Sequence, residues 1–256
     1  MLLSEVTHQS SSGLYSLIPL VVFIPVLGLL INLIFGKRMG EKFTGITASL
    51  AALGSFAIAV LMFIALNQDS FHTVQVPFAE WLHIGSFELD WVFRIDTLSV
   101  TMMLVVSGVG SLIHIYASGY MHYDVRYKEQ PEEYTRFFVY MNLFIAMMMI
   151  LVTGDSYLML FVGWEGVGLC SYLLIGFWFN RNPDASVGVK NSIAGKKAFV
   201  VNRIGDFGFL IAMFITFWAF GSLQFDEVFH QVHEGHFEPV LVTAVALFML
   251  LGVTGK

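Results

Sequence analysis

The sequence predicts an all-α polytopic membrane protein of about seven transmembrane helices, with a short β-hairpin outside the membrane. Of its 256 residues, 57% are apolar and only 12% are charged, whereas soluble domains carry about 25% charged residues. The apolar residues fall into blocks of about 20, the length that a helix needs to cross about 30 Å of hydrocarbon. One stretch between two blocks alternates polar and apolar residues, which is typical of a strand.

Seven apolar blocks separated by short polar connections define the expected spans. Windowed hydropathy favours a membrane helix in each of them. They are residues 14–36, 44–66, 97–118, 135–153, 156–179, 197–220 and 239 to the end. The last block stops at GVTGK without a polar tail, so we expect the chain to be the first part of a longer protein.

The expected hairpin lies between the second and third spans. Residues 73–76 and 86–95 form its two strands, with Pro77 and Gly85 between them. It must lie outside the hydrocarbon, because lipid cannot satisfy the backbone groups of an open strand edge. The apolar positions of the second strand are Phe87, Leu89, Trp91, Phe93 and Ile95, and its polar positions include Ser86, Glu88, Asp90 and Arg94.

The positive charges predict the orientation. Ten of the 13 Lys and Arg residues lie in the connections after the first, third and fifth spans, and only Arg94 lies in the opposite connections. By the positive-inside rule, the N-terminus and the hairpin are outside and the basic connections face the cytoplasm or its equivalent. The ten residues are Lys37, Arg38, Lys42, Arg126, Lys128, Arg136, Arg181, Lys190, Lys196 and Lys197.

Several classes of function are disfavoured by composition. The net charge is −6 and the positive residues form no basic face, so nucleic acid is not an expected partner. The single cysteine, Cys170, cannot form an internal disulfide. No nucleotide-binding glycine motif is present, and we expect no cofactor in this chain. His230, His233 and His236 are spaced three apart, but without a cysteine they make only a weak zinc motif.

Ionisable residues inside the spans are the strongest functional signal, because a charge at bilayer depth costs about 2.5–3.5 kcal/mol or more. Glu165 falls near the middle of the fifth span. It is either a structural carboxylate or a proton carrier. Lys256, flanked by Gly252 and Gly255, is its candidate partner, although a lysine at this place can also extend to the membrane surface.

The sixth span carries Arg203 and Asp206, which at a spacing of three share a helix face and can form a structural bridge or part of a polar network. Lys196, seven residues before Arg203, points the same way, whereas Lys197 does not. The third span has one hydrophilic stripe, in which His114 is either a packed hydrogen-bonding residue or part of a hydrated path that Asn142 and Arg136 extend. The stripe consists of Ser107, Ser111, His114 and Ser118.

Together these groups predict an interior network of the composition that proton relays require. A contact between Glu165 and Lys256 that opens and closes would switch the lysine between holding and releasing a proton.

Longer motifs resemble one family. The strings SLIHIYASGYM, WEGVGLCSYLLIGFW, KKAFVVNRIGDFGFLIA and GVTGK are similar to the L or chain-5 subunits of respiratory complex I, NADH:quinone oxidoreductase. The likeness extends from Asp96 to the end. It implies two inverted five-helix repeats and a lateral helix in the whole protein. Residues 1–95 would then be two N-terminal helices and the outer hairpin, and residues 96–256 the first antiporter-like repeat, ending in its seventh helix.

The resemblance also implies a function. Such subunits are proton-translocating parts of an oxidoreductase in the cell membrane or inner membrane, coupled to quinone reduction, with other antiporter-like subunits as partners and no redox centre of their own. It favours Lys197 over Lys196, against the helix-face argument. By the motifs, the residues implied in proton translocation are Glu165, Lys256, Lys197, Arg203, Asp206 and His114.

Two alternatives stay open. A subunit of a multisubunit sodium/proton antiporter resembles the same family, and Na⁺ would use the same carboxylates as H⁺. A membrane anchor or quinone-binding structural module would use the buried charges only to fix helix register.

Overall fold

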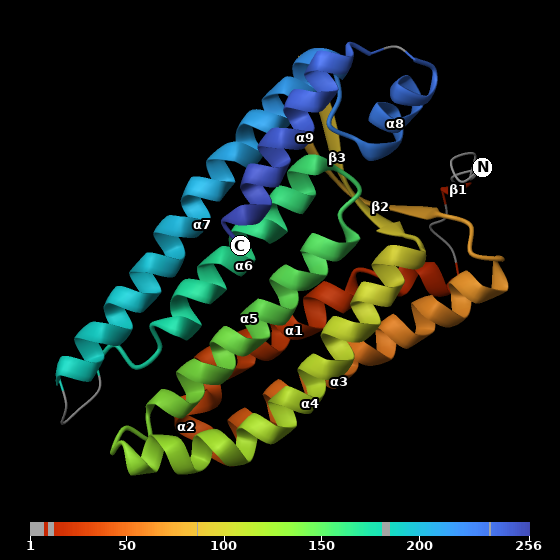
Figure 1. The fold of residues 1–256 in the computed structure, drawn as a ribbon. Helices are drawn as coiled ribbons and strands as arrows, with labels where there is room; N and C mark the ends of the chain where they lie inside the picture. Colours follow the sequence, from red (N-terminus) through yellow and green to blue (C-terminus); the bar gives the residue numbers. More distant parts are fainter. Residues whose placement is uncertain (1–7, 10–12, 86, 181–184, 236) are drawn as a thin grey trace.

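The computed structural model describes residues 8–9, 13–85, 87–180, 185–235 and 237–256. Long helices lie side by side, with a small sheet and one short helix at the same end (Figure 1). The helices are the 3₁₀ turn η1 (Gly13–Leu17), α1 (Leu20–Ile31), the π-turn η2 (Asn32–Gly36), α2 (Lys37–Met39), α3 (Glu41–Gln68), α4 (Thr97–Tyr127), α5 (Glu133–Thr153), α6 (Tyr157–Ile175), α7 (Ala185–Phe220), α8 (Phe225–His233) and α9 (Pro239–Thr254).

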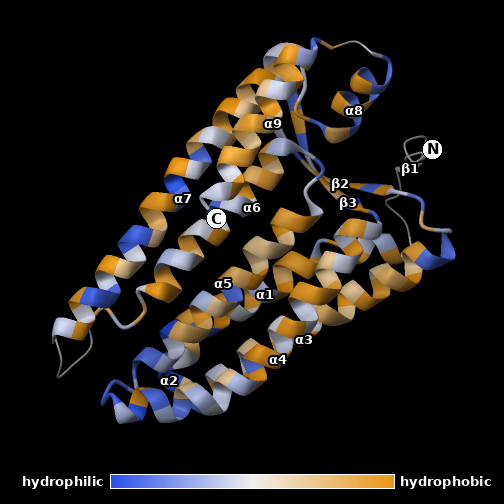
Figure 2. Ribbon diagram, in the orientation of Figure 1, coloured by the Kyte–Doolittle hydropathy of each residue, from blue (hydrophilic) through white to orange (hydrophobic). Residues whose placement is uncertain are grey.

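The predicted spans are confirmed as helices. Among the described residues, six helical segments are long and apolar enough to cross a membrane, the first of them running without a break from Gly13 to Met39. The seventh, α9, is apolar but has 16 residues. Figure 2 shows the hydrophobic middle of the long helices between more hydrophilic ends.

The outer hairpin is also confirmed. Strands β2 (Val74–Ile84) and β3 (Phe87–Ile95) pair antiparallel, with Val76 opposite Phe93, and the chain turns at Gly85, whose φ is 64°. The expected alternation appears as burial of Leu89, Phe93 and Ile95. The polar position Ser86 lies outside the described residues. The alternation gave no indication of β1 (His8–Gln9), which adds to β2 in parallel.

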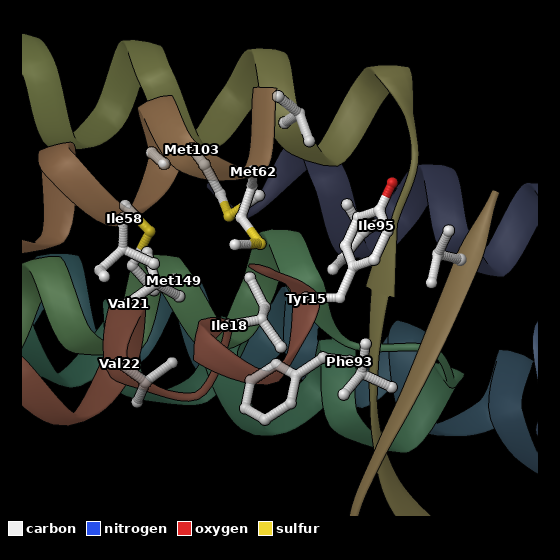
Figure 3. Packing of buried hydrophobic residues seen from close by; sticks show 14 of the residues in the cluster. Tyr15, Ile18, Val21, Val22, Ile58, Met62, Phe93, Ile95, Met103 and Met149 are labelled. Atoms are coloured by element: carbon white, nitrogen blue, oxygen red, sulfur yellow. The ribbon is translucent and has the colours of Figure 1, made fainter. Parts of the chain in front are cut away.

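The hydrophobic core joins the hairpin to the helices. Tyr15 and Ile18 of the N-terminal turn, Met62 of α3 and Met149 of α5 meet the inward side chains of β3 (Figure 3). Because the sheet rests on helix side chains, its position is set by the bundle. The sheet in turn places the charged residues of its other face over the ends of α5 and α8.

The helices form two groups. In the first, which we call the N-terminal bundle, α1, α3, α4 and α5 pack on one another; in the second, α6 packs on α7 and α7 on α9. The groups join where α5 packs on α6. That joint is close, since a Cβ at Gly163 would lie 2.5 Å from Leu151 Cα and one at Gly166 would lie 2.3 Å from Met147 Sδ. Gly163 and Gly166, on either side of Glu165, therefore allow α6 to pack closely on α5.

The basic connections gather at one end. The turn at α2, the α4–α5 turn, the end of α6 and the start of α7 all lie at the end opposite the hairpin and α8 (Figure 1). This arrangement agrees with spans that alternate in direction. Arg181, one of the ten residues that predict the orientation, lies outside the described residues.

Candidate functional site

Glu165 and Arg203 form an ion pair between α6 and α7. Nη1 of Arg203 donates to Oε1 of Glu165. Glu165 is eight residues after the first residue of α6, which at 1.5 Å per residue is about 12 Å along the helix and close to its middle. The Arg203 side chain is 51% exposed and that of Glu165 is 21% exposed. Glu165 therefore lies near the middle of its helix, as it lies near the middle of the predicted span.

Trp164 connects the other two ionisable groups of this region. Its indole Nε1 donates to Oδ1 of Asp206 at 2.7 Å, and its backbone carbonyl accepts from Nζ of Lys256 at 2.6 Å. The lysine nitrogen also lies 5.1 Å from the centre of the indole ring. We call the five residues Trp164, Glu165, Arg203, Asp206 and Lys256 the charged cluster.

Close packing of α7 against α9 brings Lys256 to this place. A Cβ at Gly205 would lie 2.8 Å from the carbonyl oxygen of Gly252, and one at Gly255 would lie 2.9 Å from Cα of Gly205. A Cβ at Gly168 of α6 would lie 2.9 Å from Nζ of Lys256. Glycine at these positions thus lets the two backbones approach and leaves room for the ammonium group.

Two of the expected pairings are not formed among the described residues in this arrangement. Lys256 does not pair with Glu165 but binds the carbonyl of the preceding residue, because the carboxylate is turned toward Arg203 on α7. Arg203 and Asp206 share a helix but not a bridge, since each has a partner on α6 instead. The spacing along α7 could not show these partners because they depend on how α6 is rotated.

The two lysines that the sequence weighs against each other are exposed. Lys196 and Lys197 both lie on α7 with their side chains open, and within the described part of the chain neither forms a hydrogen bond or an ion pair. The geometry therefore does not choose between the helix-face argument for Lys196 and the family resemblance for Lys197.

Three residues of the hydrophilic stripe of α4 are buried, and the fourth, Ser118, is half-buried. His114 has no exposed surface; its Nδ1 faces the carbonyl of Gly110 at 2.7 Å and its Nε2 faces Oδ1 of Asn142 on α5 at 3.0 Å. Ser107 and Ser111 donate to carbonyls one turn earlier. Arg136, which we expected to extend this path, instead pairs with Glu133 and donates to the carbonyl of Phe177.

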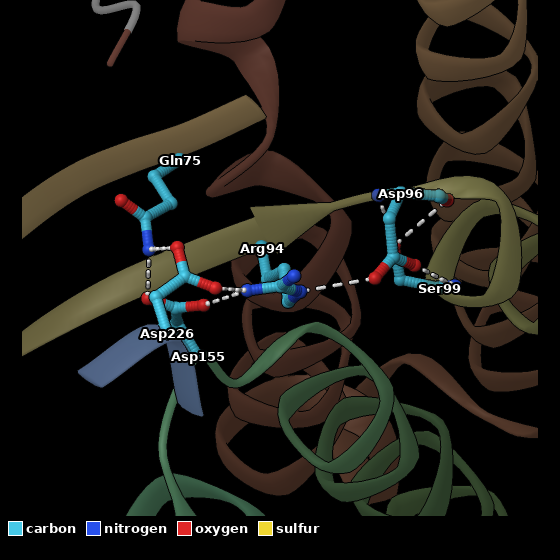
Figure 4. Close-up of polar contacts among 6 residues, drawn as sticks. All are labelled: Gln75, Arg94, Asp96, Ser99, Asp155 and Asp226. Atoms are coloured by element: carbon cyan, nitrogen blue, oxygen red, sulfur yellow. Dashed lines mark hydrogen bonds and ion pairs between the residues drawn. The ribbon is translucent and has the colours of Figure 1, made fainter. Parts of the chain in front are cut away.

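A second cluster lies outside the spans. Nη1 of Arg94 on β3 donates to Asp155, in the α5–α6 turn, at 3.0 Å and to Asp226 of α8 at 2.7 Å, while Nε donates to Asp96 at 3.0 Å (Figure 4). Nε2 of Gln75 donates to both Asp155 and Asp226. We call these five residues the Arg94 cluster. It ties the hairpin to α8 and to the corner between α5 and α6.

Burial governs the protonation of this second cluster. It raises the pKa of Asp155 to about 6, against the opposing effect of the Arg94 charge, and the charge of Asp226 adds to the increase. Burial lowers the pKa of Arg94, but the hydrogen bonds to Asp226 and Asp155 outweigh it and raise that pKa overall. Arg94 therefore stays charged, and Asp155 is the group that titrates near neutral pH.

Sequence reasoning missed Trp164, Gly205 and the Arg94 cluster. Arg94 entered only as a lone positive charge on the outer side, although its place in the alternation puts it on the face opposite Phe93. Asp155, in the short turn between two spans, was a signal that could have been used. The role of Trp164 could not be predicted from its residue type, because its hydrogen bond with Lys256 is made by its backbone carbonyl.

The structure gives no support to the weak zinc motif. His230 lies 3.6 Å from Glu234, and His236 lies outside the described residues. Among the residues that the structure describes, no group of three or more His, Cys, Asp and Glu side chains could hold a metal ion.

Comparison with known families finds two matches in this chain. Residues 81–138 match a model described as NADH-ubiquinone oxidoreductase (complex I), chain 5 N-terminus. Residues 154–256 match one described as NADH:quinone oxidoreductase/Mrp antiporter, transmembrane. The second match contains the whole charged cluster.

Individual proteins give the same picture. The chain is 42% identical over 239 residues to NADH-quinone oxidoreductase subunit L of Mycobacterium tuberculosis, covering 93% of this chain and 35% of the relative. It is 34% identical over 236 residues to NADH-ubiquinone oxidoreductase chain 5 of Hypocrea jecorina, covering 92% and 32%. The chain thus spans about a third of the length of these relatives.

Solved structures share the fold. A chain of the membrane-bound sulfane sulfur reductase, an archaeal respiratory membrane complex, superposes with a TM-score of 0.70 at 14% identity, covering 93% of this chain and 44% of that one. A chain of the Mrp complex from Dietzia sp. DQ12-45-1b gives 0.67 at 19% identity, covering 94% and 23%.

Proposed function

We propose that this chain, which belongs to the chain 5 or subunit L family of NADH:quinone oxidoreductase, carries part of the proton path of such a complex. One observation carries the proposal: a carboxylate at mid-span, Glu165, lies in one cluster with a second carboxylate and two cations from α7 and the end of α9. Ionisable groups at this depth are costly and mark ion or proton pathways.

The charge balance of the cluster suits proton transfer. Glu165 and Asp206 supply two negative charges, and Arg203 and Lys256 supply two positive ones, so the fully ionised cluster is neutral. Arginine keeps its proton in proteins. A change of charge must therefore fall on Glu165, Lys256 or Asp206. In a medium of low dielectric constant, a proton gained by one of them changes the energy of the others by several kcal/mol.

Two short movements would switch the cluster. Lys256 binds the carbonyl of Trp164, which is directly next to Glu165, so rotation of its flexible stem would bring Nζ to the carboxylate. Before that, Arg203 would release Glu165 and turn to Asp206, three residues further along α7. When Arg203 leaves, Glu165 takes up a proton; when Lys256 arrives, Glu165 gives it up. Trp164 fixes Asp206 through its indole while this happens.

The rest of the proposal follows the family. Quinone reduction elsewhere in the complex would drive the switch, with other antiporter-like membrane subunits as partners and no redox centre in this chain. His114 and Lys197 would serve the same path. The N-terminus and hairpin would face outward, and the basic connections would face the cytoplasm or matrix, in the cell membrane or inner membrane.

The test is Glu165→Gln in the complete protein within its assembled complex. The amide keeps the size of the side chain but cannot exchange a proton, so proton transport should fall by about a hundredfold, the lower end of what a positioned acid or base contributes. Glu227→Gln, an exposed glutamate of α8, is the matched control and should change nothing. Proton uptake by inside-out vesicles is measured against quinone-dependent NADH oxidation.

The outcomes separate the alternatives. Unchanged proton transport with poor assembly of Glu165→Gln would favour a structural module and overturn the proposal. The similarity to an Mrp chain supports a second candidate, a sodium/proton antiporter subunit. Transport that requires Na⁺ and continues without NADH or quinone would select it.

A further inference from the structure

Two buried polar atoms in the N-terminal bundle lack a hydrogen-bond partner in the protein. They are Oδ1 of Asn32, at the start of the π-turn η2, and Nδ2 of Asn142 on α5. Both residues have no exposed surface. A buried polar atom that stays unpaired costs about 1–3 kcal/mol, so such atoms usually mark a ligand or an ordered water.

Helix register places Asn32 about one turn from the level of Asn142. Gly28, Asn32 and Gly36 follow at intervals of four, on one face of α1 and η2. A Cβ at Gly28 would lie 2.8 Å from Nδ2 of Asn142, and one at Gly36 would lie 2.6 Å from Thr135, two turns away on α5. Asn32 therefore faces α5 between Asn142 and Thr135, about 6 Å along the helix axis from the level of Asn142. This is the spacing that one bridging water spans.

The hydrogen bonds of His114 explain why the ligand is water. Gly110 offers only a carbonyl oxygen, so Nδ1 of His114 must carry a hydrogen. When the ring is protonated, Nε2 donates to Oδ1 of Asn142 and the amide turns Nδ2 toward Asn32. When the ring is neutral, Nε2 accepts, so the amide must turn over and present Oδ1 toward Asn32 instead. Water pairs with either atom because it both donates and accepts.

A polar chain continues from Asn32 to the basic end of the bundle. Nδ2 of Asn32 donates to the carbonyl of Thr44 at 3.2 Å, and the hydroxyls of Thr44 and Thr135 lie 3.5 Å apart. Thr135 lines a cleft of about 550 Å³ between α2, the start of α3 and the α4–α5 turn. Lys37, Lys42 and Arg126 also line this cleft, which therefore opens among the residues of the basic connections.

We propose that Asn32 and Asn142 bind a water molecule which joins His114 to this cleft, forming a hydrated branch inside the N-terminal bundle, separate from the charged cluster. A proton arriving as hydronium would form an N–H bond at Nε2 while an O–H bond of the hydronium breaks and neutral water remains, with Asn142 turned aside. The water site stands independently, whereas its part in proton transfer rests on the proposed function.

Most of the ionisable groups on the helices around His114 have other partners, so His114 is the group that takes up a proton in this branch. On α1 and η2 no residue is ionisable. The ionisable groups of α3 are Glu41 and Lys42. Those of α5 are Glu133, Tyr134, Arg136 and Tyr140. Glu41 pairs with His122 of α4, and Arg136 pairs with Glu133. The hydroxyl of Tyr134 donates to the carbonyl of Ser118.

The first test is a density map of the assembled complex that shows ordered waters. We expect a peak within hydrogen-bond distance of both Asn32 and Asn142. No peak, with the two amides bonded directly to each other, overturns the proposal.

The second test compares Asn32→Leu with Ser55→Ala in proton transport by the assembled complex. Leucine has the size of asparagine but holds no water, so transport should fall about tenfold, which corresponds to one lost buried hydrogen bond. Ser55 is a matched control. It is buried on α3, and its hydroxyl donates a hydrogen bond to the carbonyl of Val21 on α1, outside the polar chain that runs from Asn32 to the cleft. Asn32→Thr adds no charge and keeps a group that both donates and accepts. It should keep both the peak and the transport, which covers the case in which Asn32→Leu fails to assemble.

Failures of the two proposals are distinguishable. If Glu165→Gln blocks transport and Asn32→Leu assembles and leaves it unchanged, the branch is wrong and the proposed function stands. If Glu165→Gln has no effect but the water peak is present, the proposed function is wrong and only the water site stands.

Discussion

Arg94 and Arg203 each bind a carboxylate from another element, but their surroundings differ. Arg94 is 17% exposed and contacts three carboxylates, from the β3–α4 junction, the α5–α6 turn and α8. Arg203 is 51% exposed and contacts one. The first guanidinium has two of its nitrogens bound to fixed acceptors, while the second keeps most of its donors available.

This difference separates a structural joint from the switch proposed for the charged cluster. Moving Arg94 would leave three carboxylates facing one another in a largely buried place, so the Arg94 cluster has one stable arrangement. Moving Arg203 leaves one carboxylate, which can take up a proton, and a second acceptor lies three residues away. A site that must change its pairing during turnover needs the second kind of surroundings.

The largest expected effect is that of Arg94→Met. Removing one partner of a buried ion pair costs about 3–5 kcal/mol, and here the cost falls on the contact between hairpin, α8 and the α5–α6 corner. Thermal unfolding of the complete protein in detergent should show this loss, and the hairpin should become sensitive to protease. Arg126→Met is the control, since Arg126 is 60% exposed and 3.6 Å from Glu41; it should stay within about 0.5 kcal/mol of the wild type. Equal losses of stability in Arg94→Met and Arg126→Met would contradict the structural role given to the Arg94 cluster.

The pH dependence of Asp155 sharpens the same comparison. Its pKa is raised from 3.8 to about 6 in the folded protein, so between these values the folded state binds a proton that the unfolded state lacks. Stability from this group is therefore greatest below pH 4 and is lost as the pH rises to 6, by about 3 kcal/mol.

Asp155→Asn removes this titration. The free energy of unfolding of the wild type, minus that of the variant, should fall by that amount between pH 4 and pH 7, as denaturant titrations at several pH values would show. A difference that is flat or rises with pH would mean that the Arg94 charge, and not burial, controls Asp155.

The sequence was sufficient for the architecture because membrane helices and hairpins have local signals. Twenty apolar residues or a period of two predict one element without reference to any other, and both predictions were confirmed. Glu165, Arg203, Asp206 and Lys256 were found the same way, as charges where hydropathy allows none. Residue types and depth are therefore readable from a single chain.

Pairings were not readable, for a physical reason. Arg203 and Asp206 are three apart, which permits a bridge on an isolated helix, but their partners depend on the rotation of α6 and on how closely Gly205 lets α9 approach. The contact of Lys256 with a backbone carbonyl leaves no mark in residue types at all. The Arg94 cluster joins segments up to 151 residues apart, which no local pattern connects.

The smallest expected effect on stability is that of Arg203→Met. Glu165 can take up a proton once the guanidinium is gone, which leaves no unpaired carboxylate, so the free energy of unfolding should change by less than the roughly 3–5 kcal/mol expected of Arg94→Met. Proton transport should nevertheless fall strongly. Without Arg203, Glu165 has no cation that binds it in one state and leaves it in the other, so its proton affinity no longer changes during the proposed switch. Thermal unfolding and proton uptake are measured on the same preparation beside Arg94→Met. A destabilisation as large as that of Arg94→Met, with transport preserved in the molecules that remain folded, would show that both arginines are structural joints and that the charged cluster does not switch.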